Sequence, residues 1–304
     1  MKKLLARLVL IFLGLLIFFV LLIAVVFRLA NRTNGTIVSS GEDRTYLLYV
    51  PESYDPSKPA PLVITIHGFA QWPAHQMQIT HWNDLAEEYG FLVVYPAGTR
   101  FPLRWRIRGE AGSDLDPMRD VAFLSDLIDK LETEYNIDPS RIYANGLSNG
   151  GAMSFLLSCR MSDRIAAIGT VAGAFLLPWE ECQPSRPVPT IVFHGTEDPI
   201  VPYQGGEYER SDIAFPYIPE WVDTLAQRNG CNDTPLVIPA SGEVSGIGYT
   251  DCSADVIFYT ITGGGHTWPG GEPIPAWIAG YTSQDIDATR VIWEFFRTHP
   301  LPGG

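Results

Sequence analysis

The stretch Asn145-Gly-Leu-Ser-Asn-Gly-Gly-Ala-Met-Ser154 places one serine, Ser148, between Gly146 and Gly150. The residues just before this motif have the β-branched and aromatic character of a buried strand, and the residues just after it have helical character. In that context a G-x-S-x-G motif forms a sharp strand-to-helix turn on which the serine hydroxyl projects from the sheet. A helix start alone would leave the second glycine unexplained. The motif therefore predicts that Ser148 is a catalytic nucleophile.

Short β-rich runs alternate with amphipathic helical stretches along the rest of the chain. Several of the β-rich runs are apolar on both faces, which favours parallel strands covered by helices on both sides. The clearest helix is predicted to start at Asp120, a good N-cap residue. We expect strands at 46–50, 62–66, 91–95, 141–144, 166–171, 190–193 and 256–261, and further helices near 80–90, 149–159, 219–228 and 284–297. The predicted fold class is α/β, with a mostly parallel central sheet and an active site beyond the strands' C-terminal ends.

Two residues downstream of Ser148 complete a candidate catalytic triad. A serine hydroxyl needs a general base, and the base needs a carboxylate that orients it and stabilises its charged form. Asp198 follows one predicted strand and His266 follows the last one, in the glycine-rich segment G-G-G-H-T-W-P-G-G. The chain order Ser, Asp, His is that of the α/β-hydrolases. We therefore predict Asp198 as the acid and His266 as the base. Glu197 remains an alternative acid, because a one-residue change in loop geometry would exchange the two carboxylates.

Acyl transfer also requires hydrogen-bond donors for the oxyanion that develops on the substrate. One donor is expected to be the backbone N–H of Asn149, directly after the nucleophile. The other is expected in the loop that follows the strand at 62–66, which begins with His67-Gly68. The backbone N–H of Phe69 is the predicted second donor. An ordinary turn at the end of the strand is the alternative interpretation of this loop.

Aromatic residues gather in the loops that surround the predicted site. We expect Trp105 and Trp268 to contact the substrate, together with Gln71 from the oxyanion loop. Trp72 and Tyr203 lie in the same group of loops. Any of these aromatic side chains could instead belong to the core.

The first 34 residues form a segment of their own. Residues 8–27 carry no charge, and a helix of that length spans roughly the 30 Å of a bilayer interior. Cleavable signal peptides have shorter apolar regions that end at an A-x-A-like site. We predict a transmembrane helix within residues 1–34 that attaches the chain to a membrane, with residues 35–304 as an extracytoplasmic catalytic domain. Secretion after cleavage of this segment is the alternative.

The four cysteines lie beyond the N-terminal segment in two local pairs. Their spacing contains no C-x-x-C motif typical of a zinc or redox site. Disulfides are typical of exported proteins. We expect Cys159 to pair with Cys182 and Cys231 with Cys252; four reduced, buried thiols are the alternative.

Charge excludes one class of partner. The chain carries 34 acidic and 21 basic residues, for a formal net charge of −13. The N-terminal segment holds basic residues and no acid, so the excess of negative charge on the remainder is larger still. A nucleic-acid partner is therefore not expected. The oligomeric state is not indicated by the sequence.

Four ordered motifs show a family resemblance over about residues 40–298. They are H-G-x-x-Q, G-L-S-N-G-G-A-M, R-P-V-P-x-x-x-F-H-G-T-x-D-P-x-V-P-Y and G-G-G-H-T-W-P-G. Together they resemble the secreted polyhydroxybutyrate depolymerase and feruloyl esterase-like serine esterases, which have the α/β-hydrolase fold. The resemblance implies the same triad of Ser148, Asp198 and His266, and it agrees with the two cysteine pairs.

The resemblance implies a serine carboxylic ester hydrolase that needs no metal and no cofactor. Its expected substrates are feruloyl or acetyl esters, or short hydroxyalkanoate esters, as small molecules or oligomers. A serine peptidase of the prolyl-oligopeptidase type has a similar motif and triad order, and it is the first alternative. The second is a binding module without catalytic activity, since a fold does not determine function.

Overall fold

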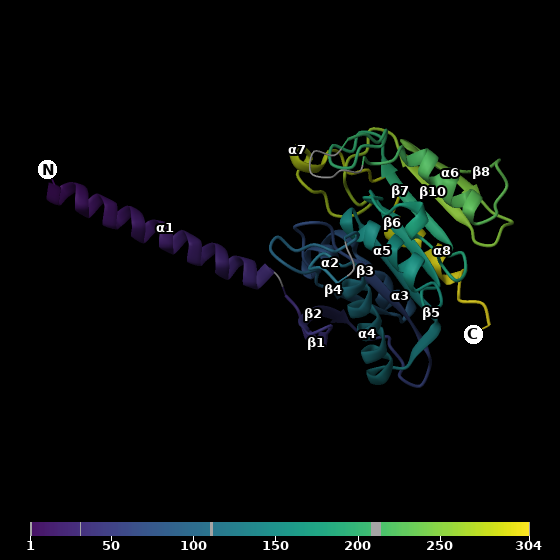
Figure 1. Ribbon diagram of the computed structural model, residues 1–304, viewed down its shortest axis with the longest axis horizontal. Helices are drawn as coiled ribbons and strands as arrows, with labels where there is room; N and C mark the ends of the chain where they lie inside the picture. Colours follow the sequence, from purple (N-terminus) through teal and green to yellow (C-terminus); the bar gives the residue numbers. More distant parts are fainter. Residues whose placement is uncertain (1, 31, 110–111, 208–213, 304) are drawn as a thin grey trace.

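The computed structural model describes residues 2–30, 32–109, 112–207 and 214–303 (Figure 1). Within these residues ten strands form one sheet, in the order β1-β2-β4-β3-β5-β6-β7-β10-β9-β8. The strands are β1 (Gly35–Ser39), β2 (Glu42–Tyr49), β3 (Ala60–Ile66), β4 (Leu92–Pro96), β5 (Ile137–Leu147), β6 (Ala167–Val171), β7 (Thr190–Gly195), β8 (Leu236–Ile238), β9 (Val244–Tyr249) and β10 (Val256–Ile261).

The centre of the sheet is parallel and its two edges are antiparallel. Strands β4, β3, β5, β6, β7 and β10 pair in parallel. β1 and β2 extend one edge in antiparallel pairing, and β9 and β8 extend the other. The expectation of a mostly parallel central sheet is confirmed. All residues of β3, β4 and β6 are buried, because helices cover both faces.

Helices cover the sheet on both sides (Figure 1). Their bounds are α2 (Pro73–Thr80), α3 (Trp82–Tyr89), α4 (Met118–Glu134), α5 (Asn149–Arg160), α6 (Ile218–Arg228), α7 (Ala276–Ala279) and α8 (Ala288–Arg297), with a short 3₁₀ helix at Trp179–Glu181. The apolar faces of α4, α5 and α6 pack into one core cluster. The apolar faces of α3 and α8 pack into a second cluster on the other side of the sheet. Two helix layers therefore enclose the sheet, as the sequence predicted.

One helix start differs from the prediction. α4 begins at Met118, with Pro117 at its N-cap, two residues before the predicted cap at Asp120. The Asp120 carboxylate is fully buried and binds arginine side chains instead of capping the helix. Both oxygens of Asp120 are engaged by Arg44 and Arg106, the latter also through its backbone N–H, so neither is directed to the start of the helix.

The N-terminal segment forms α1 (Lys2–Ala30), which extends away from the sheet in Figure 1. Its apolar side chains are exposed wherever their surroundings are described, as at Leu10 and Val20. Across the described residues, however, no helix is both long enough and apolar enough to cross a membrane. The predicted transmembrane helix is therefore not supported by the structure.

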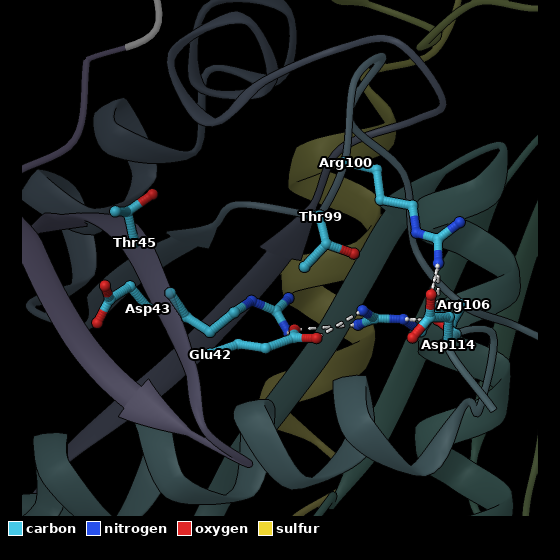
Figure 2. A pocket seen from close by; sticks show the side chains of 9 residues that line it. Glu42, Asp43, Thr45, Thr99, Arg100, Arg106 and Asp114 are labelled. Atoms are coloured by element: carbon cyan, nitrogen blue, oxygen red, sulfur yellow. Dashed lines mark hydrogen bonds and ion pairs between the residues drawn. The ribbon is translucent and has the colours of Figure 1, made fainter. Parts of the chain in front are cut away.

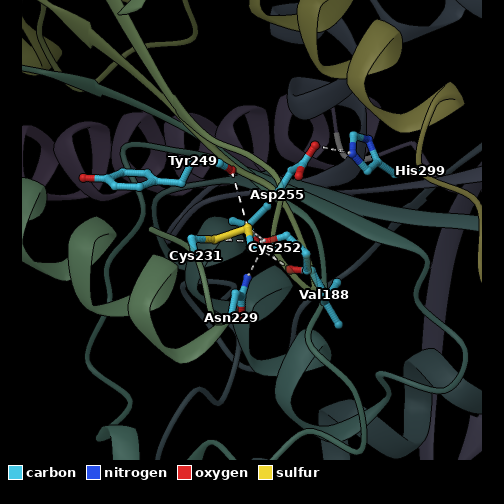
Figure 3. The surroundings of a disulfide bond; sticks show 9 residues. Val188, Asn229, Cys231, Tyr249, Cys252, Asp255 and His299 are labelled. Carbon is cyan, nitrogen blue, oxygen red and sulfur yellow. Dashed lines mark hydrogen bonds and ion pairs between the residues drawn. A yellow bond between two sulfur atoms is a disulfide. The ribbon is translucent and has the colours of Figure 1, made fainter. Parts of the chain in front are cut away.

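All four cysteines are paired as expected. Cys159, near the end of α5, is bonded to Cys182, and Cys231 is bonded to Cys252 (Figure 3). The second bridge connects the segment after α6 to the loop before β10. Next to it, the Asn229 side chain donates a hydrogen bond to the carbonyl of Ala254. The two bridges thus tie surface loops to the helices and strands that flank the parallel centre.

Candidate active site

Ser148 lies at the sharp turn between β5 and α5. Its backbone has φ 59° and ψ −118°, a left-handed conformation that is rare for a residue other than glycine. The turn is held by its neighbours: the Ser148 N–H donates to the carbonyl of Val171, and the Ser148 carbonyl accepts from Ala152 and Ala174. Strained conformations of this kind persist where the surrounding structure imposes them, often at functional sites.

The two glycines of the motif are required by close packing. A Cβ atom on Gly146 would lie 2.5 Å from the backbone of Gly150, and one on Gly150 would lie 2.0 Å from the carbonyl oxygen of Ile66. Both distances are well inside van der Waals contact. The start of α5 therefore lies directly against the ends of β5 and β3, which brings Ser148 next to the loop that follows β3.

The predicted acid and base are in direct contact. Asp198 lies three residues beyond the end of β7, and His266 lies five residues beyond the end of β10, the neighbouring strand. The Nδ1 atom of His266 is 2.8 Å from Oδ2 of Asp198, and both side chains are buried. The alternative acid, Glu197, is exposed. The geometry thus favours Asp198 as the partner of His266.

The remaining oxygen of Asp198 is held by the backbone. Oδ1 accepts hydrogen bonds of 2.8 Å from the N–H groups of Ile200 and Val201. Burial by itself raises the pKa of Asp198, but the adjacent His266 and His194 rings and the Val201 N–H outweigh it, so the pKa is lowered. Asp198 is therefore a carboxylate poised to orient an imidazole and to stabilise its positive charge.

A second histidine lies beside this pair. His194, on β7, is completely buried, and burial lowers its pKa despite the opposing charge of Asp198. Its Nε2 atom lies 2.9 Å from the carbonyl oxygen of Val201, so this nitrogen carries the proton and donates it. His194 therefore helps to hold the turn that presents Asp198.

Ser148 lies at the same edge of the sheet as Asp198 and His266. β5, β6, β7 and β10 are consecutive parallel neighbours, so their C-terminal ends meet at one edge. No hydrogen bond joins the Ser148 hydroxyl to His266 in the part of the chain that the structure describes. Catalytic hydrogen bonds of this type often tighten only once substrate is bound.

The predicted oxyanion donors are the backbone N–H groups of Asn149, directly after Ser148, and of Phe69, in the loop after β3. Among the described hydrogen bonds, none uses the backbone N–H of Phe69 or of Asn149. The loop that carries Phe69 is close to the nucleophile, since a Cβ atom on Gly68 would lie 3.4 Å from the carbonyl oxygen of Leu147. The N–H groups of Phe69 and Asn149 stay the predicted oxyanion donors.

Internal hydrogen bonds give the loop after β3 a defined shape. The side chain of Gln71 accepts from the N–H of Gly68 at 2.9 Å. The buried His67 ring accepts from the N–H of Gly98 at Nε2, and its Nδ1 therefore carries the proton and donates to the carbonyl of Gly68. Burial lowers the pKa of His67 to about 4. This ring is held neutral and acts as part of the scaffold.

Two of the predicted substrate contacts are wrong. Trp268 is 1% exposed, and its indole N–H donates to the hydroxyl of Thr289, so it belongs to the core beneath the His266 loop. Trp105 is 3% exposed and is hydrogen-bonded to His67 and Asn149. Both rings find buried partners for their polar atoms, which removes them from the substrate-facing surface. Gln71 is partly buried and stays a predicted contact.

A separate cavity of about 530 Å³ lies between β2 and the residues Gly98, Thr99, Arg100, Arg106 and Asp114 (Figure 2). Charged side chains line it, and the Arg106 guanidinium donates to the carboxylate of Glu42 and to the backbone carbonyl of Asp114. Behind the cavity, Asp120 binds both Arg44 and Arg106. This network could not be predicted from sequence spacing, because its members come from distant segments. No cluster of His, Cys, Asp or Glu among the described residues could hold a metal ion.

Residues 44–180 match the family model described as "Esterase PHB depolymerase". Over 164 residues the chain is 35% identical to a bifunctional acetylxylan esterase/xylanase of Neocallimastix patriciarum, a match that covers 54% of this chain and 23% of that protein. It is 28% identical over 275 residues to feruloyl esterase C of Emericella nidulans, covering 87% of both chains. Over residues 44–180, which include Ser148, the chain is therefore similar to the PHB depolymerase family of esterases.

A solved structure shows a similar fold. An acetyl xylan esterase from Aspergillus awamori aligns with a TM-score of 0.60 at 16% identity, covering 80% of this chain and 96% of that one. This likeness supports the α/β-hydrolase fold. The named relatives are esterases, so carboxylic ester hydrolysis is the reaction class that the comparisons support. They favour neither the peptidase nor the binding-module alternative.

Proposed function

We propose that this protein hydrolyses carboxylic esters through an acyl-enzyme formed on Ser148. The observation that carries the proposal is the buried pairing of His266 with Asp198 at the sheet edge where the strained Ser148 turn lies. With its Nδ1 proton directed to Asp198, His266 has the free Nε2 lone pair that a general base requires. The esterase relatives support the same reaction class.

In the first half of the reaction His266 Nε2 takes the proton of Ser148 as Oγ attacks the ester carbonyl. The N–H groups of Phe69 and Asn149 then donate to the oxyanion of the tetrahedral intermediate. His266 returns the proton to the departing alcohol, and Asp198 stabilises the imidazolium between these two steps. In the second half the same imidazole activates water, which releases the acid and regenerates Ser148.

The proposed substrates are feruloyl or acetyl esters, or short hydroxyalkanoate esters, as small molecules or oligomers. The names of the relatives, feruloyl esterase C and acetylxylan esterase, support the first two. The family description supports the third. Rates on methyl ferulate, p-nitrophenyl acetate, p-nitrophenyl butyrate and a hydroxybutyrate trimer, compared as kcat/KM, would rank them.

Labelling by a fluorophosphonate tests the proposed nucleophile. The wild-type protein is expected to form a covalent adduct at Ser148, and Ser148→Ala is expected to form none and to lose ester hydrolysis. A folded wild-type protein that neither labels nor cleaves any ester of the panel would rule the proposal out. Faster cleavage of a chromogenic proline dipeptide than of the aryl esters would replace it with the peptidase alternative.

We also propose that residues 35–304 are an extracytoplasmic catalytic domain, and that residues 1–34 deliver it there as an anchor or a cleaved signal. Two disulfides support an oxidising compartment. The uncharged run at 8–27 supports membrane attachment from the sequence alone. Alkaline extraction of membranes followed by intact-mass measurement separates the cases. A full-length chain that is fully released would contradict the anchor, and a shortened chain would identify a signal.

A further inference from the structure

Trp105 lies where the two halves of the proposed oxyanion hole meet. It belongs to the segment between β4 and α4 and is buried beneath the loop that follows β3. Its indole N–H donates to the backbone carbonyl of His67 at 3.0 Å. The Trp105 ring also lies against the His67 ring, with centroids 5.3 Å apart. The tryptophan is thus attached to the loop that carries Phe69.

The backbone of Trp105 is hydrogen-bonded to Asn149, the residue that supplies the other proposed donor. Its N–H donates to Oδ1 of Asn149 at 2.7 Å, and its carbonyl accepts from Nδ2 of the same side chain at 3.2 Å. The backbone N–H of Asn149 is itself one of the two proposed oxyanion donors. Because both bonds join the same two residues, they restrict rotation of the Asn149 side chain and the placement of the first residue of α5.

A further bond from the same segment holds the far side of Phe69. The carbonyl of Leu103 accepts from the N–H of Ala70 at 2.8 Å. Phe69 therefore lies between two attachment points, His67 on one side and Ala70 on the other. Both points are bound by residues 103–105.

The segment itself is fixed from behind by buried charges. The N–H of Arg106, the next residue, donates to Oδ2 of Asp120 at 2.7 Å, and its guanidinium binds Oδ1 at 3.0 Å. Arg44 binds the same Oδ1 at 2.7 Å and stacks on Phe123, whose ring is parallel to that of Trp105. Trp105 is thus connected to a buried ion-pair network in the core.

We propose that Trp105 is a positioning residue that sets the distance between the Phe69 and Asn149 N–H donors, an inference that rests on the proposed esterase function. It touches no reacting atom. Its indole bond fixes one donor loop, and its backbone fixes the residue that supplies the other donor. Errors of about 1 Å in such geometry can lower a rate by roughly 100-fold. The spacing of the two donors therefore depends on a side chain outside the substrate surface.

Trp105→Phe tests the indole bond, because phenylalanine keeps an aromatic ring in the core and lacks the N–H that donates to His67. We expect kcat to fall roughly 10-fold while KM changes by less than about 2-fold, since an oxyanion donor acts mainly in the transition state. The affinity for a boronic acid, whose tetrahedral serine adduct places an oxygen in the oxyanion hole, should fall in the same proportion as kcat/KM.

Trp293→Phe is the matched control for the loss of indole volume. Trp293 is 4% exposed, lies in the second core cluster, and its indole N–H is without a partner among the described atoms. We expect this variant to keep the wild-type kcat and boronic acid affinity. Equal kcat values for Trp105→Phe and Trp293→Phe would overturn the proposal, whatever their melting temperatures.

A second variant tests the bonds between Asn149 and the Trp105 backbone. It also keeps the proposal testable if Trp105→Phe does not fold. Asn149→Leu removes both side-chain bonds to the Trp105 backbone and keeps the backbone N–H of residue 149. We expect a similar fall in kcat. The double variant should lose less than the product of the two single fold-losses in kcat, because both changes break the same connection between the Phe69 loop and Asn149. An independent, multiplicative pair would overturn the proposal, as would an unchanged kcat in Asn149→Leu.

Failure of the esterase proposal can be distinguished from failure of the positioning role of Trp105. If the wild-type protein does not label with fluorophosphonate or hydrolyse esters, the esterase proposal fails and no ratio between variants is defined. If the wild-type protein is active and labels at Ser148, but the Trp105 and Asn149 variants match Trp293→Phe, only the positioning role fails.

Discussion

Two carboxylates of this protein are equally buried but have different partners. The side chains of Asp120 and Asp198 are both fully inaccessible to solvent. Asp120 is bound by the guanidinium groups of Arg44 and Arg106, which keep their charge at any accessible pH. Asp198 is bound by imidazole, with His266 at 2.8 Å. One carboxylate is compensated permanently, and the other faces a ring whose charge can change.

The difference separates a scaffold from a reaction centre. A permanently paired carboxylate contributes a fixed position, and removal of the Asp120 charge would leave two buried guanidinium groups to share the partly exposed carboxylate of Glu42. A carboxylate beside a neutral imidazole gains most when that ring becomes protonated, which in the proposed mechanism happens only during turnover. Removing the charge of Asp120 should therefore mainly cost stability, whereas removing that of Asp198 should mainly cost rate.

The largest expected effect is on the rate constant of Asp198→Asn. Asparagine keeps the oxygen that accepts from Ile200 and Val201 but offers no negative charge to His266. We expect kcat to fall by about 10⁴-fold on an aryl ester, with little loss of thermal stability. Glu197→Gln, at the exposed neighbouring position, is the matched control and should retain activity within about 2-fold. The reverse pattern would show that Glu197 is the acid.

Asp120→Asn should give the largest loss of stability. Two buried guanidinium groups would lose their common counter-charge, and the Arg106 N–H would lose a charged acceptor. Breaking a buried ion pair of this kind typically costs about 3–5 kcal/mol in the free energy of unfolding. Urea titration followed by circular dichroism measures it. A loss below about 1 kcal/mol would mean that the two carboxylates do not differ in the way proposed.

The parts of the site that sequence predicted best are those determined by local chemistry. The G-x-S-x-G turn needs glycines wherever strand and helix approach closely, and Gly146 and Gly150 do contact backbone at distances that exclude a side chain. The parallel centre of the sheet follows from runs that are apolar on both faces. Asp198 and His266 follow adjacent strands, so their meeting at one edge follows from the topology.

The parts that sequence predicted wrongly depend on distant partners. Trp105 and Trp268 lie in the expected loops, yet they face inward because His67 and Thr289 accept their indole protons. Asp120 has the spacing of an N-cap, but Arg44, 76 residues away, takes its carboxylate. No local pattern encodes such pairings, because each needs two segments to be placed in three dimensions first.

Because the buried His67 ring is neutral, we expect the free energy of unfolding to depend on pH, with an effect of intermediate size. Its pKa is about 4 in the folded protein, against about 6.5 for an unfolded chain. Between these values the unfolded chain binds a proton that the folded protein excludes, so stability falls as the pH falls through this window. The expected loss is roughly 3 kcal/mol from this ring, and buried His194 acts in the same direction.

His67→Gln tests this assignment. Glutamine does not titrate, so the variant should be less stable at pH 7 but should lose less stability between about pH 6.5 and about pH 4. Urea titrations across this range measure the slope for both proteins. Equal slopes would mean that the His67 pKa is the same in the folded and unfolded chain, so that folding does not hold this ring neutral.

The smallest expected effect comes from a charge at the surface. Arg164 binds Asp129 at 2.6 Å and Glu132 at 2.9 Å, connecting α4 to the turn before β6, and its side chain is 24% exposed. Because water and salt screen such a pair, Arg164→Met should cost about 1 kcal/mol or less. The difference from wild type should also shrink as sodium chloride rises from about 0.05 M to about 1 M.

Salt therefore distinguishes the two classes of ion pair directly. The cost of Asp120→Asn should be nearly the same at both salt concentrations, since Asp120 and its partner Arg44 are inaccessible to ions. A salt-dependent cost at Asp120 would show that its network is reached by solvent through the adjoining cavity. The Asp120 network would then hold the Trp105 segment less firmly at high salt. The spacing of the Phe69 and Asn149 donors should in that case vary with ionic strength, and kcat on a neutral ester would report the change.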